Sequence, residues 1–153
     1  MVKLLLYIQI MLGCDVILTK EEKAYIAGIV DGEGSIMLLK FHKNQFPAPC
    51  ISIASTTMEL LDWIKLKTGM GTIKHKKNYN LERHRECFTY VVKYNDAITL
   101  LSAIEAYLVI ETKRKRAKFI LNGYKNVTPR NGRYSLEKLE AKQMFYEEFM
   151  KLH

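Results

Sequence analysis

The sequence predicts an α+β domain in which four strands, arranged as two β-hairpins, carry helices on one side. Amphipathic helical patterns alternate with pairs of β-rich runs, and each pair is joined by a polar or proline-containing stretch. More helical patterns follow the second pair, so the expected order is helix, two strands, helix, two strands and three helices. At 153 residues, 48% of them hydrophobic, the chain has the size and composition of one folded domain.

The first helix is expected to begin at Lys20. Thr19 and Glu22 have the spacing of a capping box, in which each side chain accepts a hydrogen bond from the other residue's backbone N–H. The helical pattern continues until Gly32 and Gly34 end it.

A hairpin and a second helix follow. The run 34–43 is β-rich, 44–49 has the amides and prolines of a loop, and 50–56 is a second strand candidate. Apolar residues at helical spacing then predict a helix over 57–69, which Gly69 would end.

The second predicted hairpin pairs the runs 71–78 and 84–94 through a polar stretch. Side chains alternate between the two faces of a strand, and Ile73 favours one face as the core side. The opposite face of this strand is therefore basic and carries Thr72, Lys74 and Lys76. Other bases in or near the strands are Lys40, His42, Lys43, Arg83, Arg85 and Lys93.

Three helices are expected after the second hairpin. Asp96 is a candidate cap for the first of them, and Thr112 for the second, which would run over 113–122. The basic cluster at 113–118 falls inside that helix, so its side chains have fixed directions and one of them is expected to face a site. Apolar positions over 136–152 predict the last helix.

Residues 1–18 form an N-terminal extension ahead of the domain that spans 19–153. The extension is apolar, but Gln9 and Asp15 interrupt it, so its apolar runs are far shorter than the roughly 20 residues that cross a bilayer. A signal peptide is the competing interpretation, although no cleavage site of the A-x-A type follows. We expect a strand or helix that covers the core or a partner chain.

The charge of the chain favours a nucleic-acid partner. Its 24 Lys and Arg residues outnumber 16 Asp and Glu residues, and the formal net charge is +8. A membrane-surface protein would need a long basic amphipathic helix, and only a short stretch around 113–118 qualifies, so no membrane partner is expected. The predicted location is the cytoplasm, at the nucleoid, or an organelle.

Two acids, Asp31 and Glu33, stand where the first helix ends, although that end of a helix dipole repels anions. Ala24, Gly28 and Gly32 form a stripe of small residues that lets a second copy of the helix come close. Two Glu33 carboxylates about 4 Å apart would then repel by about 4 kcal/mol at an effective dielectric of about 20. A cation between them removes that cost, and oxygen ligands suit Mg²⁺. The alternative is that both acids are ordinary turn residues.

The stretch IAGIVDGEG (26–34) resembles the signature motif of the LAGLIDADG homing endonucleases, and the predicted order of elements resembles that family's α-β-β-α-β-β-α core. A single motif in a chain of this length implies a homodimer. The resemblance implies Mg²⁺-dependent hydrolysis of double-stranded DNA at a long pseudo-palindromic site, one phosphodiester in each strand. Other members of the family act as RNA maturases on intron RNA, and some descendants only bind DNA, so both remain alternatives.

The motif carries the family's roles onto particular residues. Glu33 matches the metal-binding acid, Gly32 the residue whose carbonyl also binds metal, and Asp31 a residue that helps to close the helix end. Lys113 matches a lysine that polarises the attacking water or steadies phosphate charge. The family often has a glutamine at the end of the second strand, and here Ser55 or Thr56 would replace it.

DNA contacts are implied along the sheet. Lys74 and Lys76 are the main candidates, and a strand bulge would decide whether Lys40 or Lys43 also faces the DNA. The further candidates are Ser35, Thr72, Arg83 and Arg85.

Overall fold

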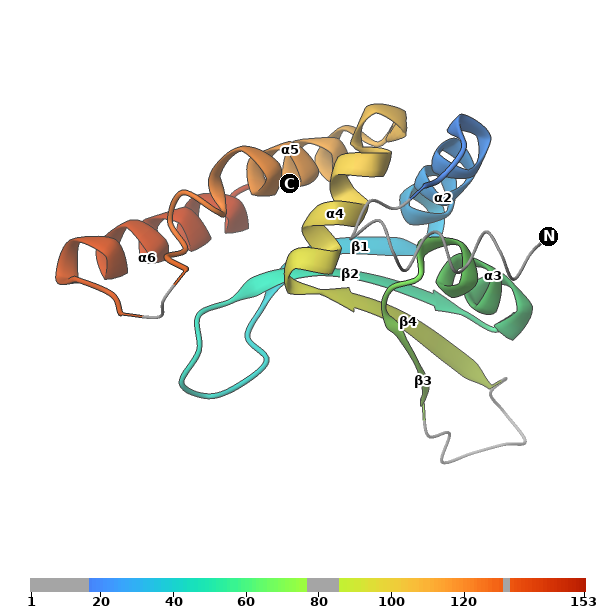
Figure 1. The fold of residues 1–153 in the computed structure, drawn as a ribbon, viewed down its shortest axis with the longest axis horizontal. Helices are drawn as coiled ribbons and strands as arrows, with labels where there is room; N and C mark the ends of the chain where they lie inside the picture. The colour runs from blue at the N-terminus through green and yellow to red at the C-terminus, as the bar shows by residue number, and fades with distance from the viewer. Residues whose placement is uncertain (1–16, 77–85, 131–132) are drawn as a thin grey trace.

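The computed structural model describes residues 17–76, 86–130 and 133–153 (Figure 1). The described elements follow the predicted α+β order. They are α2 (Lys20–Glu33), β1 (Gly34–Leu39), β2 (Ala48–Ser55), α3 (Met58–Thr68), β3 (Thr72–Lys76), β4 (Cys87–Lys93), α4 (Tyr94–Ile104), the 3-10 turn η1 (Glu105–Tyr107), α5 (Glu111–Gly123) and α6 (Leu136–Met150). Most of the predicted N-terminal extension lies outside the described residues, but Leu18 is buried in the core.

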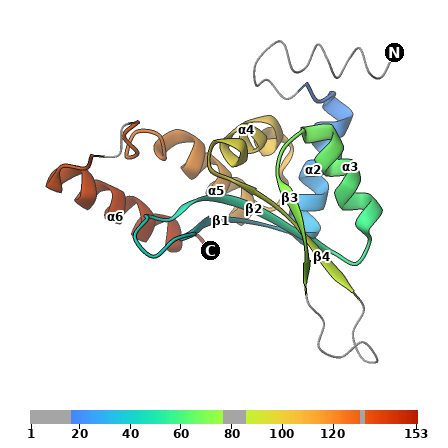
Figure 2. The same cartoon turned by 60° about the horizontal axis from the view of Figure 1, so that its bottom comes forward.

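The four strands form one antiparallel sheet in the order β1-β2-β4-β3. Helices α2 to α5 lie on one side of this sheet and leave the other side open (Figures 1 and 2). α6 lies beside α5, beyond the β1 edge of the sheet. None of the helices in the described part of the chain is both long and apolar enough to span a membrane.

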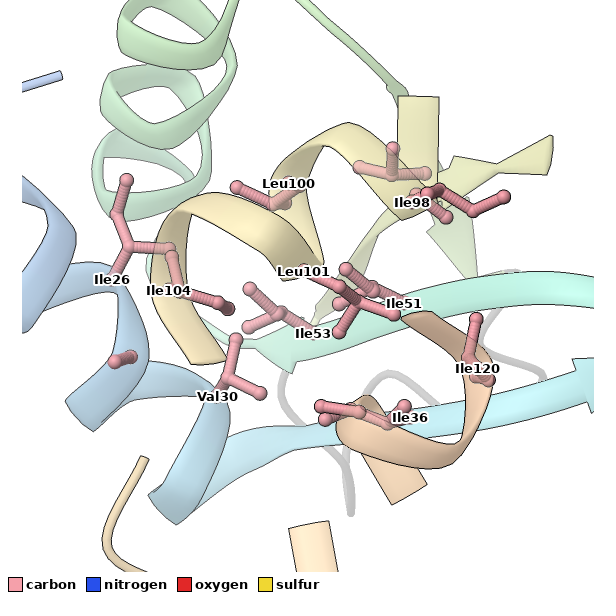
Figure 3. Packing of buried hydrophobic residues seen from close by; sticks show 14 of the residues in the cluster. Ile26, Val30, Ile36, Ile51, Ile53, Ile98, Leu100, Leu101, Ile104 and Ile120 are labelled. Atoms are coloured by element: carbon pink, nitrogen blue, oxygen red, sulfur yellow. The ribbon is translucent and has the colours of Figure 1, made fainter. Parts of the chain in front are cut away.

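Helix α4 is the centre of the core. Its Leu100, Leu101 and Ile104 are fully buried and pack over the covered face of the sheet, between α2 and α5 (Figure 3). Burying a side chain of this size contributes about 2 kcal/mol relative to leaving it in water. Their buried partners include Ile26 and Val30 from α2, Ile36 from β1, Ile51 and Ile53 from β2, and Ile120 from α5.

Two predicted helix ends are confirmed in detail. The Thr19 hydroxyl accepts from the N–H of Glu22 at 3.2 Å, and the Glu22 carboxylate accepts from the N–H of Thr19 at 3.0 Å. Gly69 ends α3 with φ of +65°, a conformation that residues with a Cβ rarely adopt.

The prediction of a first strand reaching residue 43 is wrong, because β1 ends at Leu39. Leu39 pairs with Ala48, so the next residue would face Pro47, which has no N–H to donate to the sheet. The β1–β2 register is continuous, without a bulge. Lys40 and Lys43 therefore lie in the exposed loop 40–47 rather than on a strand.

The predicted caps at Asp96 and Thr112 are also wrong. The chain turns directly from β4 into α4 at Tyr94, whose φ is +56°, so Asp96 lies inside the first turn. α5 begins at Glu111, and the side chain of its N-cap residue, Ile110, makes no capping hydrogen bond.

A buried lysine joins α6 to the end of α5. Lys142 is 3% exposed, its ammonium donates to the Thr128 hydroxyl, and it lies 3.9 Å from the centre of the Tyr124 ring. Burial lowers the pKa of Lys142 to about 8. Stacking of Phe119 on Phe145, with ring centres 4.6 Å apart, completes this contact between the helices.

Lys142→Met is expected to stabilise the protein at pH 7, because it removes the cost of burying a charge. The unfolded chain binds the Lys142 proton up to a pKa of 10.5, whereas the folded protein loses it near 8. The free energy of unfolding therefore rises with pH in this window, by roughly 2 kcal/mol between about pH 7 and 9.5. Urea unfolding of the unmodified protein and of Lys142→Met across this pH range gives the difference between their free energies of unfolding. The titration of tyrosines and cysteines is common to both proteins and cancels in this difference. A constant difference would show that the Lys142 ammonium is not desolvated.

Candidate active site and nucleic-acid interface

The carboxylate of Asp31, in the last turn of α2, binds the start of α5. Its two oxygens accept hydrogen bonds from the backbone N–H of Val109 at 2.7 Å and of Ile110 at 3.3 Å. Ile110 is the N-cap residue of α5. Asp31 therefore caps the neighbouring helix, which lies almost 80 residues further along the chain.

Lys113, the third residue of α5, returns the contact. Its ammonium donates to the backbone carbonyls of Val30, at 2.7 Å, and of Asp31. Both carbonyls belong to the last turn of α2, which contains no basic residue of its own. Lys113 thus supplies the positive charge that this helix end lacks.

At this junction each helix provides a charged side chain to the end of the other helix. Asp31 is at the unfavourable end of its own helix but at the favourable end of α5. Lys113 is at the unfavourable end of its own helix, α5, but at the favourable end of α2. The favourable placement of each charge, at the end of the other helix, contributes about 0.3 to 1 kcal/mol through the helix dipole. The hydrogen bonds to charged groups add more. The acid that looked misplaced in the sequence therefore has a structural partner.

Glu33 is the last residue of α2 and is exposed. Its carboxylate has no hydrogen-bond partner among the contacts of the described residues. The next residue, Gly34, turns at once into β1, and a Cβ there would lie 2.7 Å from the Cα of Val30. The glycine therefore allows the helix to end against the strand, which presents Glu33 at that corner.

The stripe of Ala24, Gly28 and Gly32 is exposed along α2. A Cβ added at Gly28 or Gly32 would meet no atom within 4 Å. The opposite face of the helix, with Ile26, Ala27 and Val30, is the one buried in the core. Nothing in the described protomer thus requires glycine in the stripe.

Ser55 is the last residue of β2, whereas Thr56 lies beyond the strand. Gly34 pairs with Ile53, so Ser55 is at the end of the sheet where α2 meets β1. The Ser55 hydroxyl is half-buried and accepts a hydrogen bond from the N–H of Thr57 at 3.0 Å. Its catalytic role stays a prediction.

The register of the sheet groups the side chains of its open face into rows. The first row crosses all four strands and contains Ser35, Ser52, Val91 and Thr72. The second contains Ala54, Thr89 and Lys74, and the third Met37, Cys50 and Lys93. The four strands contain no acidic residue, so this face is neutral or positive throughout.

Lys74 is exposed on the open face, as predicted from the alternation of its strand. Lys93 shares that face but was not among the predicted contacts, and its ammonium lies 4.2 Å from the centre of the Phe41 ring. The same two-residue alternation along β4 identifies Lys93, once Tyr90 and Val92 are taken as core residues. The backbone of Lys76 continues β3, and Arg83 and Arg85 lie outside the described residues.

The basic cluster 113–118 does not form one patch. Arg116 donates to the Leu152 carbonyl at 3.0 and 3.1 Å and lies over the Phe149 ring, so it fixes the end of the chain. Lys115 pairs with Glu111 at 2.7 Å, and Lys118 with Glu105 at 3.6 Å. Only Lys113 reaches the junction with α2, so one base of the cluster faces the candidate site.

The donors at the end of α2 suit a hard cation. The chain offers the exposed Glu33 carboxylate and the carbonyl of Gly32 in the last helical turn, where carbonyls lack helical partners. The described residues contain no group of three His, Cys, Asp or Glu side chains that would hold a metal within one protomer.

No protein-family model matches the sequence, and a search of curated proteins finds no match. Solved structures of homing endonucleases nevertheless share the fold. I-CvuI in complex with its target matches with a TM-score of 0.64 and 19% identity over 87% of this chain and 82% of that chain. The archaeal intron-encoded I-Vdi141I complexed with DNA gives 0.59 and 22%, over 87% and 84%. The LAGLIDADG enzyme I-GzeII gives 0.59 and 18%, over 85% of this chain but 49% of that one.

Lys113→Met is expected to lower the free energy of unfolding by about 1 to 2 kcal/mol, because two half-buried carbonyls lose a charged donor. Lys115→Met is the matched control, since the exposed pair that it removes is worth at most about 0.5 kcal/mol. Urea unfolding followed by circular dichroism measures both. Equal effects of the two variants would contradict a specific role of Lys113 at the helix junction.

Proposed function

We propose that this protein is a homodimeric, site-specific DNA endonuclease that hydrolyses one phosphodiester in each strand with the help of a divalent cation. The observation that carries the proposal is the end of α2. There the exposed acid Glu33 ends α2, and the ammonium of Lys113 binds the Val30 and Asp31 carbonyls of the same last helical turn, at the end of an acid-free sheet face. The shared fold of I-CvuI and I-Vdi141I, both solved with DNA, supports the same conclusion.

The open face of the sheet is the proposed DNA-binding surface. Strands can lie in the major groove of DNA. There alternate side chains reach the edges of the nucleobases, while Lys and Arg side chains contact the phosphates. Lys74 and Lys93 supply positive charge on β3 and β4, and Ser35, Ser52 and Thr72 supply hydroxyls that can donate or accept hydrogen bonds. Without an acidic residue on the strands, no part of this face repels phosphates.

A second copy of the chain would complete the site. The chain matches 82% of I-CvuI and 84% of I-Vdi141I but 49% of I-GzeII, so two copies of it correspond in size to one chain of the longer enzyme. The exposed stripe on α2 allows two helices to approach closely. Contact along this stripe would bring the two Glu33 residues together.

The proposed cofactor is Mg²⁺, held by the Glu33 carboxylate and the Gly32 carbonyl of each protomer. I-CvuI was solved with DNA in the presence of calcium and of magnesium. When bound, such a cation lowers the pKa of water and stabilises the leaving oxygen.

The other proposed contributions to cleavage come from residues of the chain itself. Lys113 places a positive charge at the carbonyl end of α2, where it can stabilise charge that develops on the scissile phosphate. The proposed role of the Ser55 hydroxyl, which accepts a hydrogen bond from the N–H of Thr57, is to hold a water at the same end of the sheet. The sheet keeps the DNA in register so that the reacting groups stay aligned.

An RNA maturase or a DNA-binding protein without activity would keep the basic sheet. Neither function needs an exposed carboxylate next to bound phosphates, because it weakens binding by repulsion. The presence of Glu33 in the helical turn whose carbonyls bind Lys113 therefore favours the nuclease.

Glu33→Gln is expected to abolish cleavage while it retains DNA binding, because it removes the charge that holds the cation and keeps the size of the side chain. The substrate is the intronless insertion site of the host gene, incubated with Mg²⁺, and binding is measured by gel shift. Glu137→Gln, at an exposed position on α6, is the control and should cleave normally. Loss of binding together with cleavage would assign Glu33 a structural role. Tight binding of intron RNA without cleavage by the unmodified protein would support the maturase.

Gly28→Leu is expected to convert the dimer into a folded monomer, because the added side chain fills the proposed contact between helices but meets nothing in its own protomer. Replacing glycine inside a helix should also raise the stability of the protomer, by up to about 1 kcal/mol. Light scattering after gel filtration gives the mass, and thermal unfolding the stability. Ala141→Leu on the exposed side of α6 is the control and should remain a dimer. A dimeric Gly28→Leu protein would place the interface elsewhere.

A further inference from the structure

The geometry points to Asp31 as a positioning residue for DNA cleavage, which acts through Lys113 and not through contact with DNA. This inference rests on the endonuclease function proposed above. Asp31 holds the segment from which α5 starts, and Lys113 is the third residue of that helix. The carboxylate therefore determines where the Lys113 ammonium lies.

Among the described residues, the contacts that hold the start of α5 to α2 are the bonds of Asp31 and those of Lys113 itself, and packing adds little. Leu108 is buried before it and Ala117 within it, but Val109 is 79% exposed and Ile110 46% exposed. Neither residue can be fixed by packing to the extent that a core residue is. The described hydrogen bonds of their N–H groups both end on Asp31.

The first turn of α5 depends on this acceptor in a second way. No side chain at the N-cap position makes a capping bond, so Asp31 takes the place of a local cap. Without the carboxylate the two N–H groups would bind water and the first turn would fray. Lys113 lies in that turn, so its ammonium would lose its fixed place on the Val30 and Asp31 carbonyls.

Binding and cleavage should respond differently to this change. The open face of the sheet lies on other elements, and its strand pairing does not involve Asp31 or α5. Misplacing a charged group by about 1 Å can cost 100-fold in rate. Loss of Asp31 should therefore slow cleavage while the affinity for DNA stays nearly unchanged.

The test uses Asp31→Ala, Asp31→Asn and the full-length dimer. The probe is a duplex selected from a random library for binding to the unmodified protein and then shown to be cut with Mg²⁺. Asp31→Ala is expected to lower kcat by about 10- to 100-fold, with a change in Kd of less than about threefold. Asp31→Asn keeps one carbonyl acceptor and should fall between Asp31→Ala and the unmodified protein.

Two controls separate positioning from a loss of stability. Asp62→Ala removes an exposed acid from α3 and should change neither parameter. Ile64→Val destabilises the core from α3, which provides no residue of the junction, and it should keep kcat when assayed well below its unfolding temperature. A kcat reduced equally in Ile64→Val and Asp31→Ala, or unchanged in Asp31→Ala, would overturn the proposal.

A direct measurement of Lys113 completes the test. In protein with ¹⁵N-labelled lysine, the ammonium signal that disappears in Lys113→Arg reports the hydrogen-bonded group. That signal should broaden or vanish in Asp31→Ala and persist in Asp62→Ala. A sharp signal in Asp31→Ala would show that Asp31 does not position Lys113. If the unmodified protein cuts no selected duplex, the endonuclease function is wrong, and the NMR signal still decides whether Asp31 fixes Lys113.

Discussion

The reciprocal contact in which Asp31 of α2 and Lys113 of α5 each bind the end of the other helix is the constraint on which the candidate site depends. Asp31 caps α5, and Lys113 neutralises the carbonyl end of α2, so each helix end is satisfied by a residue of the other helix. Gly34 then lets the strand start without a connecting loop, which leaves Glu33 exposed at the corner. Two helices and a strand are thereby fixed at one point, and the acid, the lysine and the end of the sheet keep constant relative positions.

The two faces of the sheet divide the work of the molecule. Ile36, Ile51 and Ile53 point into the core beneath α4, and their burial provides much of the stability. Among the alternate residues on the same strands, Ser35, Ser52 and Ala54 are small or polar, so they can change with little cost to folding. This separation lets a rigid scaffold carry the proposed recognition surface.

Local signals predicted the elements, and non-local contacts explain the errors. Thr19, Glu22 and Gly69 act within one helical turn, so their sequence patterns were sufficient. The start of α5 was misplaced because its cap, Asp31, is 79 residues before Ile110 in the chain. In the site, the motif pointed to Glu33 and the pattern K-x-x-x-A to Lys113, and their catalytic roles stay predictions. The partners of Lys113 and the contact of Lys93 with the Phe41 ring required the tertiary structure, because they depend on which segments become neighbours.

The rows across the open face define how a change in the proposed DNA preference would have to be built. Successive residues on one face of a strand are about 6.7 Å apart, which is close to two base-pair steps of about 3.4 Å. If the strands follow the groove, each row therefore reads about two base pairs. Ser35, Ser52, Val91 and Thr72 belong to one such reading unit, whereas Lys74 belongs to the next. Side chains within a row are direct cross-strand neighbours and must be varied together, while residues two or more rows apart can be exchanged independently.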